Sequence, residues 1–330
     1  MEKAQAYIRI QELRNMINEA NRRYYVENSP TLSDYEFDML LKELEALEDE
    51  HPELKTGDSP TQRVGSDLKT RIAKAGGKEF DQYPHKYPML SLGNTYDMTE
   101  LQAFAERAAK SIGNAFTYSC ELKFDGTAIC LTYKDGRLFR ALTRGDGSVG
   151  DDVTGNVKHI SNIPQELKVP KGFVPSLLQP QPWPEEFEIR GEIYMPWPAF
   201  ERLNEERVKD EEAPFANPRN AASGSLKLID SSMVANRGLE CTLYHLLGED
   251  LPFQTHDQAL KAAESWGLPV SDKRKICKSI EEIEDFINYW DTERKTLLFA
   301  TDGIVVKINE LPYQEELGYT AKFPRWAVAY

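Results

Sequence analysis

The stretch E-L-K-F-D-G at residues 121–126 is the most informative part of the sequence. Residues 116–124 form a β-type run that ends next to Lys123, and the Asp-Gly pair that follows forces a turn. A lysine at this position is presented at the mouth of a sheet, where neighbouring cations favour its uncharged, nucleophilic amine. Taken alone, the motif is more typical of a lysine that extends from a strand edge beside a turn.

Further β-type runs surround this stretch. They lie at 127–133 and 137–143, joined by the hairpin signal Lys134-Asp135-Gly136, and at 187–195, 239–247 and 303–308. Helices are expected at 199–208, 259–266 and 280–293, and a proline-rich surface loop is expected at 169–184. Because strands and helices do not alternate regularly, the sequence favours an α+β fold with antiparallel sheets over a doubly wound parallel fold.

The first 70 or so residues have a different pattern, in which apolar residues recur every three or four positions. One stripe contains Ile10, Leu13, Ile17, Ala20 and Tyr24, and a second contains Phe37, Leu40, Leu41, Leu44 and Leu47. Between them, Ser33 and Glu36 have the spacing of a helix capping box. We therefore expect a helical hairpin subdomain at 1–70 and a second domain at 71–330, joined by a linker within 58–78.

Composition excludes several classes of protein. The 330 residues carry a formal net charge of −14, whereas a chain that wraps nucleic acid by itself is expected to be basic. No apolar run approaches the roughly 20 residues that a membrane span needs, and the polar N-terminus is not a signal peptide. The four cysteines are scattered without a C-x-x-C pair, so we expect no zinc site, no disulfide framework and a cytoplasmic location.

Three more motifs place charges next to glycine. Arg144-Gly145-Asp146-Gly147 follows a strand run, Arg190-Gly191-Glu192 lies within one, and Asp302-Gly303 begins the run that ends near Lys307. Strand-end lysines with glycines and carboxylates suit a site that neutralises phosphate and reads a ribose. A solvent-facing strand edge remains the alternative for Arg190-Gly191-Glu192.

In this order, the motifs resemble those of the nucleotidyltransferase superfamily of DNA ligases and capping enzymes. Longer blocks resemble bacterial NAD-dependent DNA ligases in particular: D-S-P-T-Q-R-V-G at 58–65, P-M-L-S-L-G-N at 88–94, F-A-N-P-R-N-A-A-S-G-S-L at 215–226 and P-R-W-A-V-A-Y at 324–330. The resemblance covers essentially the whole chain. It implies the adenylation fragment of such an enzyme, with a helical subdomain that binds the nicotinamide mononucleotide half of NAD and an antiparallel-sheet, ATP-grasp-like nucleotidyltransferase core.

The resemblance also implies roles for individual residues. Lys123 matches the lysine that attacks the adenylyl phosphorus of NAD, releases nicotinamide mononucleotide and forms lysyl-AMP. Glu121 matches the residue that reads the adenine amino group. Tyr244 matches the aromatic residue on which adenine stacks, although core packing explains Tyr244 better from the sequence alone. The other matches are Ser91 and Leu92 on the adenosine side, Arg144 and Glu192 on the ribose side, and Arg219, Arg294 and Lys307 at phosphate.

The hairpin carries the residues that match a nicotinamide pocket. Asp34 and Asp38 are spaced to share one helix face, Tyr24 and Tyr25 end the preceding helix, and Phe37 stands where a tyrosine is common. Aromatic rings with carboxylates suit a cationic ring. From spacing alone, an amphipathic hairpin with a solvated acidic face is the simpler interpretation.

Two departures from the family pattern matter. Lys227 stands where many relatives have arginine, which predicts a weaker phosphate or DNA contact. The chain also stops at Tyr330, before the lysine and the DNA-binding modules that follow in the family. We therefore expect a monomer that binds DNA weakly, with nicked double-stranded DNA as the substrate of a longer protein. Mg²⁺ is implied by the chemistry, and spacing indicates no metal ligands.

Two other functions remain open from the sequence. One is an ATP-dependent ligase or capping-type enzyme. The hairpin with Tyr24, Tyr25, Asp34 and Asp38 argues against it, because ATP needs no nicotinamide pocket. The other is a non-catalytic NAD-binding or interaction module, against which Lys123 argues.

Overall fold

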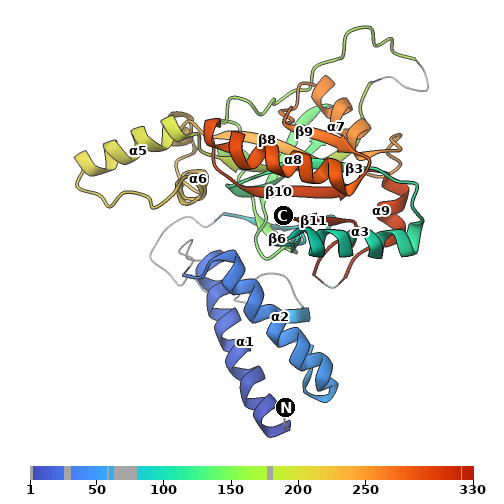
Figure 1. The fold of residues 1–330 in the computed structure, drawn as a ribbon. Coiled ribbons are helices and arrows are strands. Elements are labelled where there is room, and N and C mark those ends of the chain that lie inside the picture. The colour runs from blue at the N-terminus through green and yellow to red at the C-terminus, as the bar shows by residue number, and fades with distance from the viewer. Residues whose placement is uncertain (1–2, 26–30, 58, 63–79, 177–180, 321) are drawn as a thin grey trace.

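The computed structural model describes residues 3–25, 31–57, 59–62, 80–176, 181–320 and 322–330. It has a helical hairpin, which lies below a larger body built on β-sheets in Figure 1. The expected boundary between residues 70 and 71, and most of the expected linker, lie outside the described residues. No helix in the described ranges is both long enough and apolar enough to span a membrane.

The hairpin consists of α1 (Lys3–Tyr25) and α2 (Asp34–Glu50), as the apolar stripes predict. Its core is a cluster of six fully or almost fully buried side chains: Ile10, Leu13, Ile17, Leu41, Leu44 and Leu47. The capping box at Ser33 is confirmed, because the Ser33 hydroxyl accepts from the Glu36 N–H and the Glu36 carboxylate accepts from the Ser33 N–H. Apolar burial along one face of each helix therefore builds the hairpin.

A buried carboxylate ties the next segment to the hairpin. Glu48 is fully buried and accepts hydrogen bonds from Arg14 at 2.6 Å, from the Ser59 hydroxyl at 2.6 Å and from the Thr61 hydroxyl at 2.6 Å. A buried charge is tolerated only when it is paired and hydrogen-bonded in this way. The described part of block 58–65 thus supports α2, alongside the short 3-10 helices η1 (Pro52–Leu54) and η2 (Pro60–Gln62).

The larger body contains two main sheets. The five-stranded sheet has the order β2-β11-β10-β3-β9, and the four-stranded sheet has the order β5-β4-β7-β8. The strands are β2 (Gly93–Asn94), β3 (Tyr118–Phe124), β4 (Thr127–Lys134), β5 (Arg137–Thr143), β7 (Glu186–Tyr194), β8 (Glu240–Leu247), β9 (Arg274–Cys277), β10 (Thr301–Ile308) and β11 (Ala327–Ala329). A small pair, β1 (Gln82–Pro84) and β6 (Val149–Asp151), lies apart from them.

Pairing is antiparallel throughout both main sheets except between β11 and β2, which are parallel. The prediction of an α+β fold with antiparallel sheets and the six predicted strands are confirmed, and the parallel pair lies at one edge of the five-stranded sheet. The β4–β5 hairpin turns through Asp135 and Gly136, which both have positive φ (49° and 76°), as Asp-Gly predicts.

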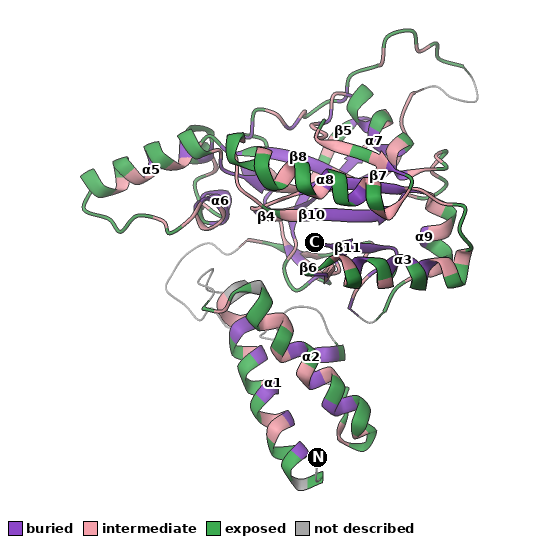
Figure 2. Cartoon of the chain, viewed as in Figure 1, coloured by how far each residue is buried: buried purple, intermediate pink, exposed green. Residues whose placement is uncertain are grey.

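Helices cover the sheets and close two cores. They are α3 (Met98–Ile112), α4 (Thr154–Val157), α5 (Trp197–Lys209), α6 (Pro218–Leu226), α7 (His256–Ser265), α8 (Ile280–Glu293) and α9 (Leu311–Leu317), with 3-10 turns η3 (Ser231–Asn236) and η4 (Arg294–Thr296). Side chains from α3 and α8, such as Leu101 and Ile283, pack on the five-stranded sheet, and Trp266 packs with Phe187 on the four-stranded sheet. Figure 2 shows the strands as mostly buried and the outer helix faces as exposed.

The turn at Asp125-Gly126 joins the two sheets, because β3 belongs to one sheet and β4 to the other. A side chain at Gly126 would place a Cβ only 2.2 Å from the carbonyl oxygen of Ile193 on β7. Glycine is therefore required here by close backbone approach. The fold thus places Lys123 at the point where the chain leaves one sheet and enters the next.

Candidate active site

Lys123 is the last residue but one of β3, and its ammonium group forms an ion pair with the Asp302 carboxylate on β10. The antiparallel register sets Gly303 opposite Lys123, which brings the neighbouring Asp302 to the same end. Both side chains are partly exposed, at 29% and 24%. We expected cations around Lys123, but the structure gives it an anionic partner.

Arg219 and Asp125 form a second ion pair at this end of the sheet. Asn217 caps α6, Pro218 opens it, and Arg219 therefore leaves the first helical turn towards Asp125, with Nη1 3.4 Å from Oδ1. Burial raises the pKa of Asp125, while the charge of Arg219 acts in the opposite direction. A carboxylate and a guanidinium thus flank the lysine turn.

Glu192 lies on β7 within electrostatic reach of the same groups. It follows Gly191, where a Cβ would come within 2.2 Å of the Thr242 carbonyl oxygen on β8, and the β7–β8 register shifts at that point. Loss of water contact raises the pKa of Glu192 to about 8, although the charges of Arg219 and Lys123 lower it. At neutral pH this carboxyl is therefore mostly protonated and can donate a hydrogen bond.

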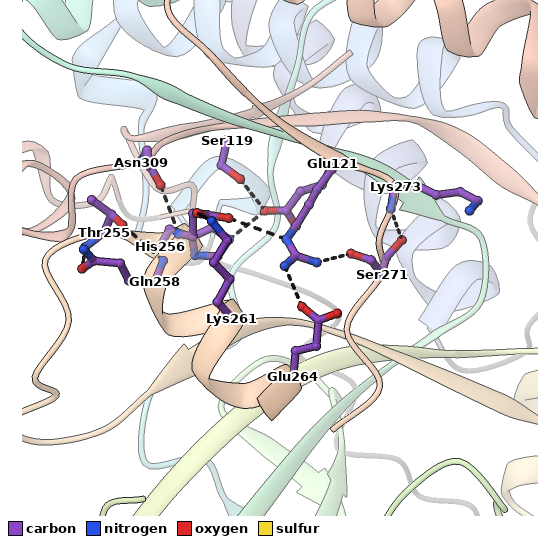
Figure 3. A network of polar contacts seen from close by, with 12 residues as sticks. Ser119, Glu121, Thr255, His256, Gln258, Lys261, Glu264, Ser271, Lys273 and Asn309 are labelled. Carbon is purple, nitrogen blue, oxygen red and sulfur yellow. Dashed lines mark hydrogen bonds and ion pairs between the residues drawn. The ribbon is translucent and has the colours of Figure 1, made fainter. Parts of the chain in front are cut away.

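A buried polar cluster lies deeper along β3. The Glu121 carboxylate accepts from Lys307 Nζ at 2.9 Å and from the Ser119 hydroxyl at 3.0 Å, and it contacts His256 Nε2 at 2.7 Å. Figure 3 shows Ser119 and His256 turned towards Glu121. Lys307 also donates to the Tyr244 carbonyl at 2.8 Å, and its ammonium lies 5.3 Å from the centroid of the Tyr244 ring.

The charges of this cluster depend on one another. Burial alone would raise the pKa of Glu121, but Lys307 and His256 outweigh it and lower the pKa to about 2. Burial lowers the pKa of Lys307, and the attraction of Glu121 opposes that change. Burial and the charge of Lys307 lower the pKa of His256, so its imidazole is neutral at physiological pH. The cluster therefore combines one anion, one cation and one neutral ring.

A third group lies beside the glycine-rich turn after β5. Arg144 Nη2 donates to the Ser91 hydroxyl at 2.7 Å, so two residues that the sequence assigned to nucleoside contacts are in direct contact. Leu92 packs on the core of the five-stranded sheet. Gly145 has a φ of 56°, which is the left-handed conformation that glycine adopts readily.

Helix α2 meets the core through Asp38. Its Oδ2 accepts from Asn94 Nδ2 at 2.7 Å and from the Tyr96 hydroxyl at 2.7 Å. Lys42 forms an ion pair with Glu100 at 3.0 Å. The face of α2 that sequence analysis assigned to nicotinamide therefore lies against the loop between β2 and α3.

A buried lysine also contacts this face of α2. The ammonium of Lys322 lies 5.7 Å from the centroid of the Phe37 ring, and only 8% of the residue is exposed. Burial lowers the pKa of Lys322 to about 8, although Glu45 and Asp38 raise it. Lys322 is thus a cation held close to the acidic face of α2.

Some predicted site residues are not joined to these groups. Arg294 lies in η4, where it pairs with Asp291 at 3.3 Å and is about half exposed. Lys307, which we expected at phosphate, is by contrast part of the Glu121 cluster. Lys227 pairs with Asp151 at 2.9 Å. The side chains of Tyr24, Tyr25 and Asp34 lie outside the described residues.

Sequence reasoning missed several residues that the fold brings to the site. Asp302 belongs to a quoted motif but was not singled out, and its pairing with Lys123 spans 179 positions. Asn94 ends the quoted block at 88–94 but was not singled out either, and His256, Tyr96 and Lys322 gave no motif signal. A Thr255-Gln258 capping box could have shown that His256 begins a helix, but not that it faces Glu121.

The described residues contain no group of three or more His, Cys, Asp or Glu side chains arranged to hold a metal. What they do contain is a partly exposed lysine beside carboxylates and an arginine, with a desolvated donor–acceptor cluster and an aromatic ring next to it. This arrangement is expected of a protein that binds a nucleotide and transfers part of it to a lysine.

Comparison with known proteins identifies the family. Residues 77–330 match the model of the NAD-dependent DNA ligase adenylation domain, and residues 3–65 match the DNA ligase-like, N-terminal NAD+-binding domain. The chain therefore belongs to the NAD-dependent DNA ligase adenylation-domain family.

Curated relatives agree with this assignment. The chain is 53% identical over 322 residues to a DNA ligase of Phocaeicola vulgatus, which covers 98% of this chain and 46% of the relative. It is 49% identical over 330 residues to a DNA ligase of Cytophaga hutchinsonii, which covers 100% of this chain and 46% of the relative. The chain thus spans just under half the length of these relatives.

Solved structures that resemble the chain include a putative ATP-dependent DNA ligase from Aquifex aeolicus. The sequence identity is 14%, the TM-score is 0.34, and the match covers 68% of this chain and 46% of that one. A likeness this weak adds nothing to the family assignment.

Proposed function

We propose that the chain transfers AMP from NAD to Lys123 and releases nicotinamide mononucleotide. The observation that carries this proposal is the position of Lys123. It is partly exposed at the junction of two sheets, two residues along β3 from the buried Glu121 cluster. Side chains at positions i and i+2 of a strand share a face and are about 7 Å apart. That separation suits a base bound at Glu121 and a phosphate at Lys123.

The base is held at the buried end. Glu121 accepts from the adenine amino group, and the Tyr244 ring stacks on the base. Lys307 belongs to this end, since its ammonium contacts Glu121 and the Tyr244 carbonyl. We therefore reassign Lys307 from the phosphate to the ring nitrogen of the base, and we leave the phosphates to Arg219.

The ribose lies between the two ends. Glu192, mostly protonated at neutral pH, donates to or accepts from a ribose hydroxyl. Arg144 and Ser91, already in contact, form one side of the nucleoside site, and Leu92 gives it an apolar floor.

The transfer step forms a bond between Lys123 Nζ and the adenylyl phosphorus, and it breaks the bond from that phosphorus to the oxygen of the leaving mononucleotide. Lys123 must first give up a proton, because an ammonium group has no lone pair. The Asp302 carboxylate, already paired with Lys123, accepts that proton. Arg219 neutralises charge on the phosphates as the leaving group departs.

The nicotinamide half is bound by the hairpin. Phe37 stacks on the ring, Asp38 attracts its positive charge, and Tyr24, Tyr25 and Asp34 complete the pocket. Asp38 contacts Asn94 and Tyr96 of the core, so the hairpin is already docked over the core by the residue that would receive the ring. Binding of NAD then exchanges or extends these contacts.

Magnesium would supply charge screening for the phosphates. The described residues offer no three-ligand site, and Mg²⁺ is usually bound by one or two carboxylates together with substrate phosphates. No step above runs through a metal.

For a full-length relative that contains such a chain, the name DNA ligase indicates nicked double-stranded DNA as the substrate, and we propose the same substrate for this protein. The 330 residues carry a net charge of −14, and nonspecific DNA affinity comes mainly from phosphate neutralisation. We therefore propose that this part of the protein binds DNA weakly. We also keep as proposals that it is monomeric and works in the cytoplasm.

The test is intact-mass measurement of the chain after incubation with NAD, followed by peptide mapping. One added AMP on Lys123 is the expected result. ATP in place of NAD should give no label, because ATP has no nicotinamide for the hairpin to bind. Label on another lysine, or equal labelling from ATP, would overturn the proposal.

A further inference from the structure

His256 belongs to none of the sequence motifs named above, yet it occupies the centre of the buried cluster. Its side chain is 1% exposed, and its Nε2 lies 2.7 Å from Glu121 Oε1 and 3.2 Å from Lys307 Nζ. A buried imidazole in contact with both a carboxylate and an ammonium constrains where the protons of all three groups lie.

The two contacts of Nε2 cannot both be hydrogen bonds. Towards Glu121, Nε2 has to carry the proton and donate it. Towards Lys307, Nε2 would have to offer its lone pair. Glu121 is the stronger partner, because it is ionised and the contact is 0.5 Å shorter. We assign the proton of the neutral imidazole to Nε2 on this argument.

This assignment fixes the remaining bonding capacity of the cluster. Glu121 Oε1 already receives two hydrogen bonds, from His256 and from Ser119, whereas Oε2 receives one from Lys307. Lys307 has three N–H groups and gives two of them to Glu121 and to the Tyr244 carbonyl. Oε2 therefore keeps acceptor capacity, and the third N–H of Lys307 is not bound by His256.

The backbone holds His256 in place independently of its side chain. Thr255 caps α7 with a reciprocal capping box to Gln258, so His256 is the first helical residue. The N–H of His256 donates to the Asn309 carbonyl at 2.6 Å, and the N–H of Asp257 donates to the Asn309 side chain at 3.1 Å. Asn309 follows β10, which carries Lys307. The imidazole and the ammonium are thus anchored to the same strand end, and Figure 3 shows Asn309 beside the start of α7.

We propose that His256 is a positioning residue that sets the specificity of the nucleotide site for a 6-aminopurine. Because His256 holds Oε1 of Glu121, Oε2 of Glu121 and the third N–H of Lys307 remain side by side as a hydrogen-bond acceptor and a hydrogen-bond donor for the base. Adenine offers the complementary order, a donor at its amino group and an acceptor at N1. Hypoxanthine offers the reverse, so its carbonyl would face the Glu121 anion. This inference rests on the proposed adenylyl transfer.

The experiment compares NAD with nicotinamide hypoxanthine dinucleotide as donors, by the rate of nucleotide attachment measured by intact mass. The wild-type chain should prefer NAD strongly. His256→Phe keeps a ring but removes the donor, so the preference should fall by about 10-fold or more, the value of one hydrogen bond to a buried charge. The loss should appear in KM for NAD, with kcat little changed, because Lys123 is untouched.

Two further variants distinguish a positioning role of His256 from a purely structural role. His256→Gln retains an N–H donor and should restore most of the preference. Gln258→Ala removes the capping box of α7 without touching Glu121. It should lower the melting temperature slightly and leave the preference unchanged. The proposal would be overturned if His256→Phe lost activity equally with NAD and with nicotinamide hypoxanthine dinucleotide. It would also be overturned if His256→Gln folded but did not restore the preference for NAD.

Calorimetric binding of adenosine and inosine tests the same inference without any reaction. His256→Phe should narrow the difference in affinity between the two nucleosides, and an unchanged difference would refute the inference. If the wild-type chain takes no label from NAD, the proposed transfer fails while these affinities still report on His256. If it is labelled but His256→Phe keeps the wild-type preference, only the inference about His256 fails.

Discussion

Two ends of the proposed nucleotide site, both on β3, differ in their physical character. At the buried end, Glu121 in the middle of β3 forms hydrogen bonds with three side chains and has almost no contact with water. At the other end, Lys123 is partly exposed and pairs with a partly exposed Asp302. Recognition of a base benefits from groups that are fixed and desolvated in advance. A nucleophile, in contrast, has to lose a proton and approach a phosphate. The difference indicates that binding and chemistry can be altered separately.

The largest expected effect is at the reactive end. Lys123→Ala should abolish AMP attachment, because no other amine is presented at that turn, while adenosine affinity changes little. Lys123→Arg is the matched control, since it keeps the positive charge without a nucleophilic amine. Intact mass and calorimetry measure the two properties. A parallel loss of adenosine binding in Lys123→Ala would show that the two ends are not separable.

The free energy of unfolding should depend more on the buried Glu121 cluster than on the partly exposed pair of Lys123 and Asp302. Lys307→Met leaves the Glu121 charge buried without its cation and should cost about 3–5 kcal/mol of unfolding free energy. Asp302→Asn removes a partly exposed ion pair and should cost ~1 kcal/mol or less. Denaturant titration of both variants gives the comparison. The double variant Glu121→Gln with Lys307→Met should recover part of the loss, and equal costs for the two single variants would contradict the distinction.

Changes in the helical hairpin should affect labelling by NAD more than the affinity of the core for adenosine. Asp38→Ala should reduce labelling by NAD by about 10-fold or more, because the nicotinamide ring loses a carboxylate partner. Adenosine affinity in the core should stay the same. Tyr96→Phe removes one of the two core donors to Asp38 and should have a smaller effect, of about 2- to 5-fold. Equal loss of labelling and of adenosine affinity in Asp38→Ala would mean that the hairpin only supports the core.

The last comparison concerns the dependence of stability on pH. The folded-state pKa of Glu192 is raised to about 8, so the folded chain binds more protons than the unfolded chain above the ordinary glutamate pKa. Stability contributed by this residue should therefore fall as pH rises from about 4.5 to about 8. Glu121, with its pKa lowered to about 2, should act in the opposite sense: its contribution is present above about 4.5 and is lost as pH falls towards 2.

Glu192→Gln should flatten the dependence of melting temperature on pH between about 5 and 8. Glu201→Gln, at an exposed position of α5, is the control and should leave the dependence unchanged. A slope that persists in Glu192→Gln would show that another group produces it.

Local sequence was enough for much of the fold. The 3- and 4-residue spacing of Ile10, Leu13 and Ile17, the Ser33 capping box and the Asp135-Gly136 turn each act within a few residues of the chain, and each is confirmed. The short strands β2, β9 and β11 were missed, because two to four residues give too little periodicity to recognise. Helix α3 was also missed.

For the site, the sequence by itself determined which residues carry charge next to glycine turns, because a turn and a strand end are local properties. Only the tertiary structure decided which of them meet. Asp302 reaches Lys123, and His256 and Lys307 reach Glu121, across separations of 135 to 186 positions. These pairings are set by strand register and by the anchoring of α7 to the end of β10, which are properties of non-local packing. Burial then fixes the charge state of each group, since desolvation exists only in the folded chain.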